Sequence, residues 1–149
     1  VALGDSKHLI TAEDLPFIIA DVMESKEYQY LELKKCDIST GLDRGSSVSL
    51  VVTINGEEFD GSGIGNGGFD AFMDAITKIL VKISFTMPVL KDYEVHIPRG
   101  GKTDALTECI ITWESEIQEF KTRGVDSNQV MAAVKATTRM INMKMHADN

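Results

Sequence analysis

The chain has 149 residues, 43% of them hydrophobic, and carries a formal net charge of -8. This length and composition fit an ordinary folded domain that buries a core, and no apolar run approaches the roughly eighteen residues that a membrane span needs. Because the chain is acidic and has no basic stripe, nucleic acid and anionic membranes are poor candidates as partners.

The first segment, residues 1–27, is predicted to be a helical arm. The chain opens without an initiator methionine and without the charge pattern of a signal peptide, which suggests a domain cut from a longer polypeptide. Residues 11–14 begin a helical pattern that ends near residue 25. Its apolar stripe consists of Leu15, Ile18, Ile19, Val22 and Met23. We expect this stripe to dock on its own domain or on a partner chain.

Three strands are predicted to follow the arm. Residues 28–38 form a strand whose apolar positions change phase between Leu33 and Cys36, which indicates a β-bulge. Residues 46–54 alternate regularly, so this strand has one buried face. The Asn55-Gly56 pair then predicts a tight turn that leads into a short strand over residues 57–60.

A glycine-rich stretch, residues 59–71, connects these strands to a helix predicted from Phe69 to Ile83. Five of the eight residues from 61 to 68 are glycine, and each loses much backbone entropy on folding. Either positive φ angles or a ligand lying close to the backbone would explain them. The free N–H groups of the helix start could receive a carboxylate or a phosphate. The alternative to a ligand site is a turn in which the glycines serve only the backbone geometry.

The same stretch matches a dinucleotide-binding pattern by its letters. Residues 63–68 read G-x-G-x-x-G, which marks a nucleotide site when it follows the first buried strand of a βαβ unit. Here the preceding residues predict an antiparallel hairpin instead. The sequence context therefore argues against a nucleotide-binding fold.

The second half of the chain repeats this order. Strands are predicted over residues 93–97, 105–113 and 117–123, and a corner over residues 124–128 leads to a helical stripe over residues 130–141, with Asp126 or Ser127 as the helix cap. Identical residues recur 61 positions apart: Phe59 and Phe120, Gly63 and Gly124, Ala71 and Ala132, Ala75 and Ala136, Thr77 and Thr138. The predicted fold class is α+β: an internal duplication of β-β-β-α units, each an antiparallel three-stranded sheet with a helix, preceded by a helical linker arm.

No group of residues in the sequence predicts catalysis. The histidines stand singly, and no nucleophile elbow or metal-ligand spacing is present. Cys36 and Cys109 lie far apart inside predicted strands, so we interpret them as small core residues in a reducing compartment. Two pairs of acidic residues flank predicted hairpin turns, and we interpret them as solvated surface residues rather than as a catalytic acid and base. A binding module is the favoured class.

Three motifs carry a resemblance to a known family. Residues 63–71 read GIGNGGFDA, residues 90–96 read LKDYEVH, and residues 124–127 form a weaker third match. With the duplication, they make the chain resemble the C-terminal regulatory (leucine-binding, dimerisation) domain of 2-isopropylmalate synthases and of the closely similar citramalate synthases. The first family pattern is G-x-G-N-G-P-hydrophobic-D-A, from which the chain departs at Gly68. The resemblance covers about residues 28–143, and residues 9–25 look like the preceding linker.

The resemblance implies a feedback-regulatory domain over residues 28–149, with one repeat at about 28–86 and another at about 87–149. Its implied partners are a second copy, a branched-chain amino acid, and an N-terminal catalytic domain. The effector would be leucine for a 2-isopropylmalate synthase or isoleucine for a citramalate synthase. A purely structural dimerisation module without ligand is the alternative from another class.

The same resemblance places the catalysis elsewhere. The parent enzyme would carry a metal-dependent barrel that condenses acetyl-CoA with a 2-oxo acid. We therefore expect this chain to have no catalytic residues, no metal and no cofactor, and to be cytoplasmic. The arm would be the element that transmits the regulatory signal to the barrel.

The family pattern also implies where the ligand binds. The N–H groups of the glycine corner would hold its carboxylate without an arginine, and apolar residues would surround its side chain. Burying a leucine side chain is worth about 1.5–3 kcal/mol, which discriminates poorly against isoleucine. The implied site residues are Asn66, Gly67, Gly68, Phe69, Asp70, Leu90, Tyr93, Ile97, Ala105 and Thr107.

Overall fold

In this computed structural model the described residues are 29–43, 45–97, 106–116 and 118–148. The arm predicted over residues 1–27 and the implied site residue Ala105 lie outside them. No helix in the described part of the chain is long and apolar enough to cross a membrane.

Two β-β-β-α units follow one another along the chain. The elements are β1 (Leu31–Gly41), β2 (Gly45–Ile54), β3 (Glu57–Gly65), α3 (Gly68–Val81), β4 (Val89–His96), β5 (Thr107–Glu114), β6 (Glu119–Asp126) and α4 (Gln129–Asp148). Each unit forms one antiparallel sheet, in the order β1-β2-β3 or β4-β5-β6. The predicted α+β duplication is confirmed.

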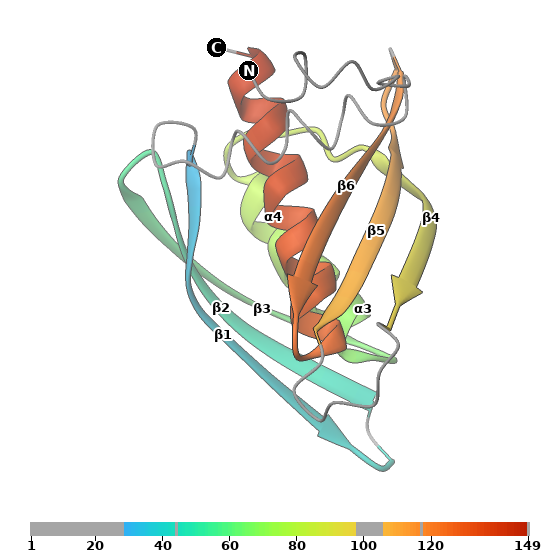
Figure 1. Cartoon of the computed structure of the whole chain (residues 1–149). Helices are drawn as coiled ribbons and strands as arrows, with labels where there is room; N and C mark the ends of the chain where they lie inside the picture. The colour runs from blue at the N-terminus through green and yellow to red at the C-terminus, as the bar shows by residue number, and fades with distance from the viewer. Residues whose placement is uncertain (1–28, 44, 98–105, 117, 149) are drawn as a thin grey trace, which may run out of the picture.

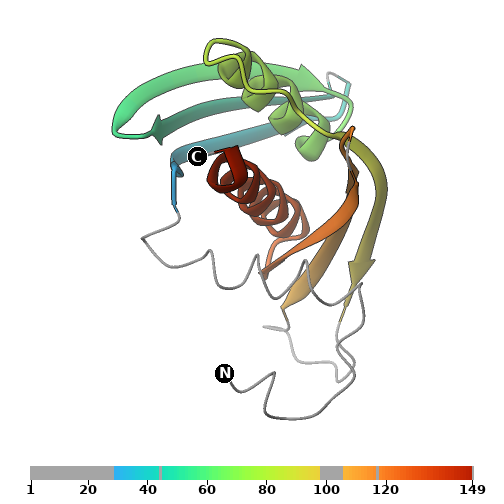
Figure 2. The same cartoon turned by 90° about the horizontal axis from the view of Figure 1, so that it is seen from above.

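The helices pack on the inner faces of the sheets. Helix α3 lies against β2 and β3, and α4 lies against β5 and β6 while also reaching β1 of the other unit. Figures 1 and 2 show the two sheets set at an angle to each other, with α4 in the space between them. One continuous hydrophobic core results, and it includes the fully buried side chains of Leu50, Ile76, Ile111 and Ile141.

Two local predictions in the first unit are confirmed. The pairing of β1 with β2 shifts between Leu33 and Lys35, where the phase of the apolar residues changes. Asn55 and Gly56 both have positive φ, 52° and 86°, as the tight hairpin turn requires. Strand β4 carries the same irregularity between Leu90 and Asp92, so the bulge is part of the duplicated unit.

The glycine-rich stretch corrects one prediction. The third strand does not stop at residue 60 but continues as β3 to Gly65, so Gly61, Gly63 and Gly65 belong to a strand. A Cβ on Gly63 would collide with the backbone of Ala71 and Ala75 in α3. Neither positive φ nor a ligand accounts for these three glycines, because the space that their side chains would need is filled by α3.

The second unit repeats this close packing. A Cβ on Gly124 of β6 would collide with the carbonyl oxygen of Ala132 and the backbone nitrogen of Ala136 in α4. These three residues are the duplicates of Gly63, Ala71 and Ala75. Glycine on the strand and alanine on the helix thus set the helix–sheet spacing in both units.

Asn142 joins the two units. Its Oδ1 accepts hydrogen bonds from the backbone N–H groups of Tyr30 (2.9 Å) and Leu31 (2.8 Å), and its Nδ2 donates to the carbonyl oxygen of Leu31 (3.3 Å). The side chain is buried, so these bonds satisfy an amide that would otherwise be costly to bury. Helix α4 of the second unit is thereby fastened to the beginning of β1.

Candidate functional site

The start of α3 has no side-chain cap. Gly67 precedes the helix with extended backbone angles (φ -133°, ψ 172°) and makes no capping hydrogen bond. The first helical bond runs from the N–H of Ala71 to the carbonyl oxygen of Gly67 (3.0 Å), so the N–H groups of residues 68–70 precede it. A Cβ on Gly67 would meet no atom within 4 Å. Among the described residues, nothing fills the space that a side chain at Gly67 would take, and Asp70 is the acidic residue of the first turn.

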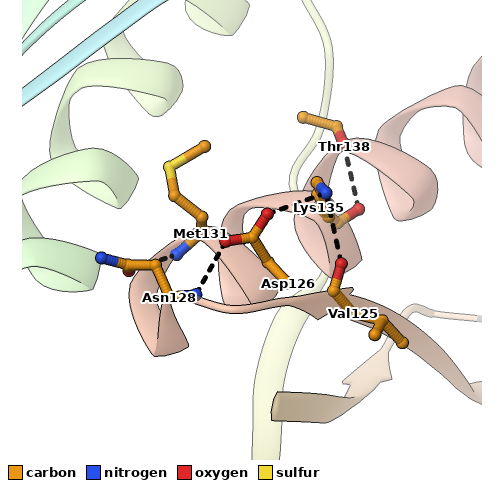
Figure 3. A network of polar contacts seen from close by, with 6 residues as sticks. All are labelled: Val125, Asp126, Asn128, Met131, Lys135 and Thr138. Atoms are coloured by element: carbon orange, nitrogen blue, oxygen red, sulfur yellow. Dashed lines mark hydrogen bonds and ion pairs between the residues drawn. The ribbon is translucent and has the colours of Figure 1, made fainter. Parts of the chain in front are cut away.

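The start of α4, by contrast, has a side-chain cap (Figure 3). Asn128 Oδ1 accepts the N–H of Met131 (3.0 Å), and Asp126 Oδ2 accepts the N–H of Asn128 (2.8 Å). Lys135 Nζ donates to Asp126 Oδ1 (2.9 Å) and to the carbonyl oxygen of Val125 (3.2 Å). This corner therefore offers a side-chain acceptor to its helix start, which the corner before α3 does not.

The cap of α4 differs from the prediction. Asp126 or Ser127 was expected to cap the helix, but α4 begins at Gln129 and the cap is Asn128. All three residue types are good caps, so only the helix boundary decides among them. Asp126 instead supports the cap, and the N–H of Asn128 followed by Lys135 lowers the pKa of its carboxyl.

The same helix position covers the outer edge of the neighbouring strand in both units. In the first unit, Asp74 Oδ2 accepts the N–H of Ile64 (3.0 Å) and the ammonium of Lys78 (3.0 Å). The bond from Ile64, followed by that from Lys78, lowers the pKa of Asp74. The duplicates of Asp74 and Ile64 are Lys135 and Val125, which make the corresponding contact with the charge reversed.

Aromatic side chains border the open start of α3. The rings of Phe69 and Tyr93 lie 5.6 Å apart between centroids at an angle of 38°, so the first turn of α3 contacts β4 of the other unit. Burial, followed by the neighbouring Cys109, raises the pKa of the Tyr93 hydroxyl, and the nearby Gln129 acts in the opposite direction. A Cβ on Gly68 would lie 3.3 Å from Val130. The starts of the two helices are therefore neighbours.

The implied site residues among the described ones lie in three places. Asn66, Gly67, Gly68, Phe69 and Asp70 form the corner, and Tyr93 reaches it through the Phe69 ring. Thr107 and Ile97 lie at the end of the second sheet where β6 leads into α4, because Thr107 pairs with Asp126 and Ile97 directly follows β4. Leu90 lies at the opposite end of β4, paired with Trp113.

Two neighbours of the corner were missed by the sequence analysis. Gln129 lies near the Tyr93 hydroxyl, and Val130 lies beside Gly68. Both are duplicates of corner residues, since Gln129 and Val130 stand 61 positions after Gly68 and Phe69. The register of the duplication could have found them, because the corners of paired units can meet. No cluster of metal-ligating side chains occurs among the described residues.

Comparisons with known proteins identify the family. The family described as LeuA allosteric (dimerisation) domain matches residues 9–145. The chain is 34% identical over 144 residues to a 2-isopropylmalate synthase of Methanocaldococcus jannaschii, an alignment that covers 95% of the chain and 27% of that protein. It is 27% identical over 147 residues to a Methanoculleus marisnigri protein named as an (R)-citramalate synthase, covering 99% of the chain and 29% of the relative.

A third relative gives the same result. The identity to a 2-isopropylmalate synthase of Aquifex aeolicus is 29% over 141 residues, which is 94% of the chain and 26% of that protein. The chain thus spans little more than a quarter of the length of these relatives. The resemblance drawn from the three motifs is confirmed. The chain belongs to the LeuA allosteric (dimerisation) domain family, which it shares with 2-isopropylmalate and citramalate synthases.

Proposed function

We propose that this domain binds leucine at the start of α3 and, within a longer chain, transmits feedback inhibition to an N-terminal catalytic barrel. The family match supports an allosteric role, and relatives named 2-isopropylmalate synthase support leucine as the effector. The domain would act as a homodimer. In this proposal catalysis, the divalent metal and acetyl-CoA belong to the barrel, and the protein is cytoplasmic.

The contrast between the two helix starts carries this proposal. Asn128 accepts an N–H of the first turn of α4, whereas Gly67 has no side chain to do the same for α3. The N–H groups of residues 68–70 can receive a carboxylate, and the helix dipole favours its negative charge. Because Gly67 has no side chain, the backbone of an amino acid can approach closely.

Phe69 and Tyr93 supply the apolar contact that the ligand side chain needs. Both are partly exposed and lie in contact, one on each unit. Burial of a leucine-sized side chain against them contributes about 1.5–3 kcal/mol. Isoleucine has the same number of carbons and differs only in branching, so it remains the second candidate effector, as the citramalate synthase relatives also indicate.

Isothermal titration calorimetry with leucine, isoleucine and alanine tests the proposal. We expect saturable binding of leucine and no heat with alanine. At a ligand concentration a hundred times Kd, binding should stabilise the folded domain by about 2.7 kcal/mol, which a thermal scan would detect. A dimer that responds to none of the branched-chain amino acids would favour a purely structural dimerisation module.

A matched pair of variants separates the pocket from the fold. Tyr93→Ala should remove the ligand-induced stabilisation with little change in the melting temperature of the free domain. Tyr30→Ala is the control, because Tyr30 bonds to His146 near the end of α4, away from the helix starts. If Tyr93→Ala unfolds the free domain, Tyr93 is a core residue and its assignment to the pocket is wrong.

A further inference from the structure

The core of the first unit is open at an edge that is covered in the second unit. Phe120 in β6 is buried, with 5% of its surface exposed, whereas its duplicate Phe59 in β3 is only partly buried. The helices differ in the same sense, because α4 has 20 residues and α3 has 14. After α3, Ser84 adopts a positive φ of 59° and ends the helical path. The first unit therefore lacks the last turns of helix that the second unit has.

A groove of about 340 Å³ lies at this open edge, between the β2–β3 hairpin, the residues after α3 and the end of α4. Its apolar and aromatic lining, named the Phe59 groove, consists of Tyr30, Ile54, Phe59, Ile83, Phe85 and Met145. Asn55, Glu57 and Ser84 complete the lining. Four of the apolar residues pack against the core and stay only partly buried: Phe59, Ile83, Phe85 and Met145. Such a groove can be filled by further apolar side chains.

The chain enters the described fold beside this groove. Tyr30, which lines the groove, is held by its backbone on both sides. Its N–H donates to Asn142 Oδ1 (2.9 Å), and its carbonyl oxygen accepts the N–H of Asn55 (2.8 Å). Its hydroxyl forms a hydrogen bond with His146 Nδ1 (3.0 Å). The point from which the predicted arm departs is therefore fixed at the groove.

The arm itself lies outside the described residues, but its sequence limits where it can dock. Its apolar stripe ends at Met23, seven residues before Tyr30. Seven residues span at most about 25 Å, so the end of the stripe must stay near the groove. A tether this short gives the stripe an effective concentration on the order of millimolar at that place. The family match begins at residue 9 and thus includes the stripe in the same domain.

We propose that the arm, residues 11–25, docks its apolar stripe into the Phe59 groove of its own chain. The stripe side chains complete the core edge that the shorter helix α3 leaves open. The short tether favours the same chain over a second copy as the source of the arm. This inference goes beyond the proposed leucine site, which lies at the other end of α3, and does not depend on it.

Hydrogen–deuterium exchange of the 149-residue chain tests the docking. An isolated helix of 15 residues is marginal in water, so slow exchange in residues 15–25 would report docking rather than helix propensity. We expect these amides to exchange about tenfold faster in Ile83→Glu, which places a charge in the groove, than in wild type. Val81→Glu is the matched control, because Val81 is 67% exposed at the end of α3 and does not line the groove.

A change in the arm provides the reciprocal measurement. Val22→Glu lies outside the described fold and should leave the exchange of β2 amides as in wild type. It should nevertheless expose the groove, so hydrogen peroxide should oxidise Met145 faster than in wild type. This readout decides the matter even if Ile83→Glu destabilises the fold.

Three results would overturn the inference. Fast exchange of residues 15–25 in wild type would show that the arm is not docked. Unchanged oxidation of Met145 in Val22→Glu would place the arm on another surface. Protection of the arm that disappears on dilution to a monomeric chain would assign the docked arm to a second copy. None of these measurements uses leucine, so a failure of the proposed ligand site leaves them unaffected.

Discussion

Gly67 and Asn128 occupy the same position in the two units and lie directly before α3 and α4. Asn128 caps its helix through the N–H of Met131, and Lys135 and Asp126 reinforce this corner. Gly67 offers no side chain and leaves the first turn of α3 open. One copy of the duplicated unit therefore caps its helix with a side chain, and the other does not; in the proposed function, the uncapped start receives the ligand carboxylate.

A second difference lies inside the units. In the second unit the Trp113 indole N–H donates to Thr122 Oγ1 (2.9 Å), which in turn donates to the carbonyl oxygen of Ala136 (2.8 Å). In the first unit the duplicates of Trp113 and Thr122 are Val52 and Gly61, which have no polar side-chain atoms. The second unit thus contains a buried polar network, and the first relies on close apolar packing.

The largest expected loss of stability tests a feature that both units share, the close packing of a strand glycine against helix backbone. Gly63→Ala and Gly124→Ala should each lower the free energy of unfolding by about 3 kcal/mol, because the new methyl group collides with helix backbone. Urea denaturation measures both. Gly67→Ala is the control and should cost no more than about 1 kcal/mol, because alanine is a poorer residue before a helix but meets no atom there. A neutral Gly63→Ala would contradict the close β3–α3 packing.

Thr122→Val should break the network of the second unit. The variant leaves the buried indole N–H of Trp113 without an acceptor, which costs about 1–3 kcal/mol of unfolding free energy. Adding Trp113→Phe should cost less than the sum of the two single changes, because the unpaired donor is then absent. Thr138→Val, which removes a hydroxyl at the helix surface, serves as the control. Additive losses would argue against a coupled network.

The helix caps provide a smaller difference between the units. Asn128→Ala should destabilise the domain by about 1 kcal/mol, because the N–H of Met131 loses its acceptor. Asn66→Ala, on an exposed residue of the other corner, should leave the unfolding free energy unchanged. Chemical denaturation of both variants compares them directly. Equal losses would mean that the two corners are stabilised alike.

The smallest expected effect is on the stability of the domain at acidic pH. Hydrogen bonds lower the folded-state pKa values of Asp74 and Asp126, so each contributes stability that is fully present above the unfolded-state pKa. This stability is lost as pH falls through the folded-state pKa. As pH is lowered from about 5 to about 2, the melting temperatures of Asp74→Asn and Asp126→Asn should fall less steeply than that of wild type. Because both carboxyls are partly exposed, high salt should reduce the difference from wild type.

Much of the fold follows from the sequence because strands and helices have different periods. The regular alternation in residues 46–54 and the phase change after Leu33 both predicted what β2 and β1 show. The extent of β3 could not be predicted in this way, because Gly61, Gly63 and Gly65 carry no side chains and hide the alternation. Their role became visible only with α3 lying against them.

The candidate site was predictable in part. The corner and Tyr93 came from motifs that lie close together in the sequence or match a family pattern, and the Phe69–Tyr93 contact joins them. Gln129 and Val130 were missed because their closeness to the corner depends on how the two units pack together. Packing between repeats leaves no periodic signal in either repeat alone.

Leucine titration of Gly67→Val tests most directly whether the open start of α3 is the ligand site. The extended φ of Gly67 and the free space around it allow valine without strain, so the free domain should keep its melting temperature. The valine side chain would occupy the space of the ligand carboxylate, and we expect leucine affinity to fall at least tenfold, which is about 1.4 kcal/mol. Ser127→Val at the capped corner should bind leucine like wild type. If Gly67→Val binds leucine with unchanged affinity, the ligand does not lie at the start of α3.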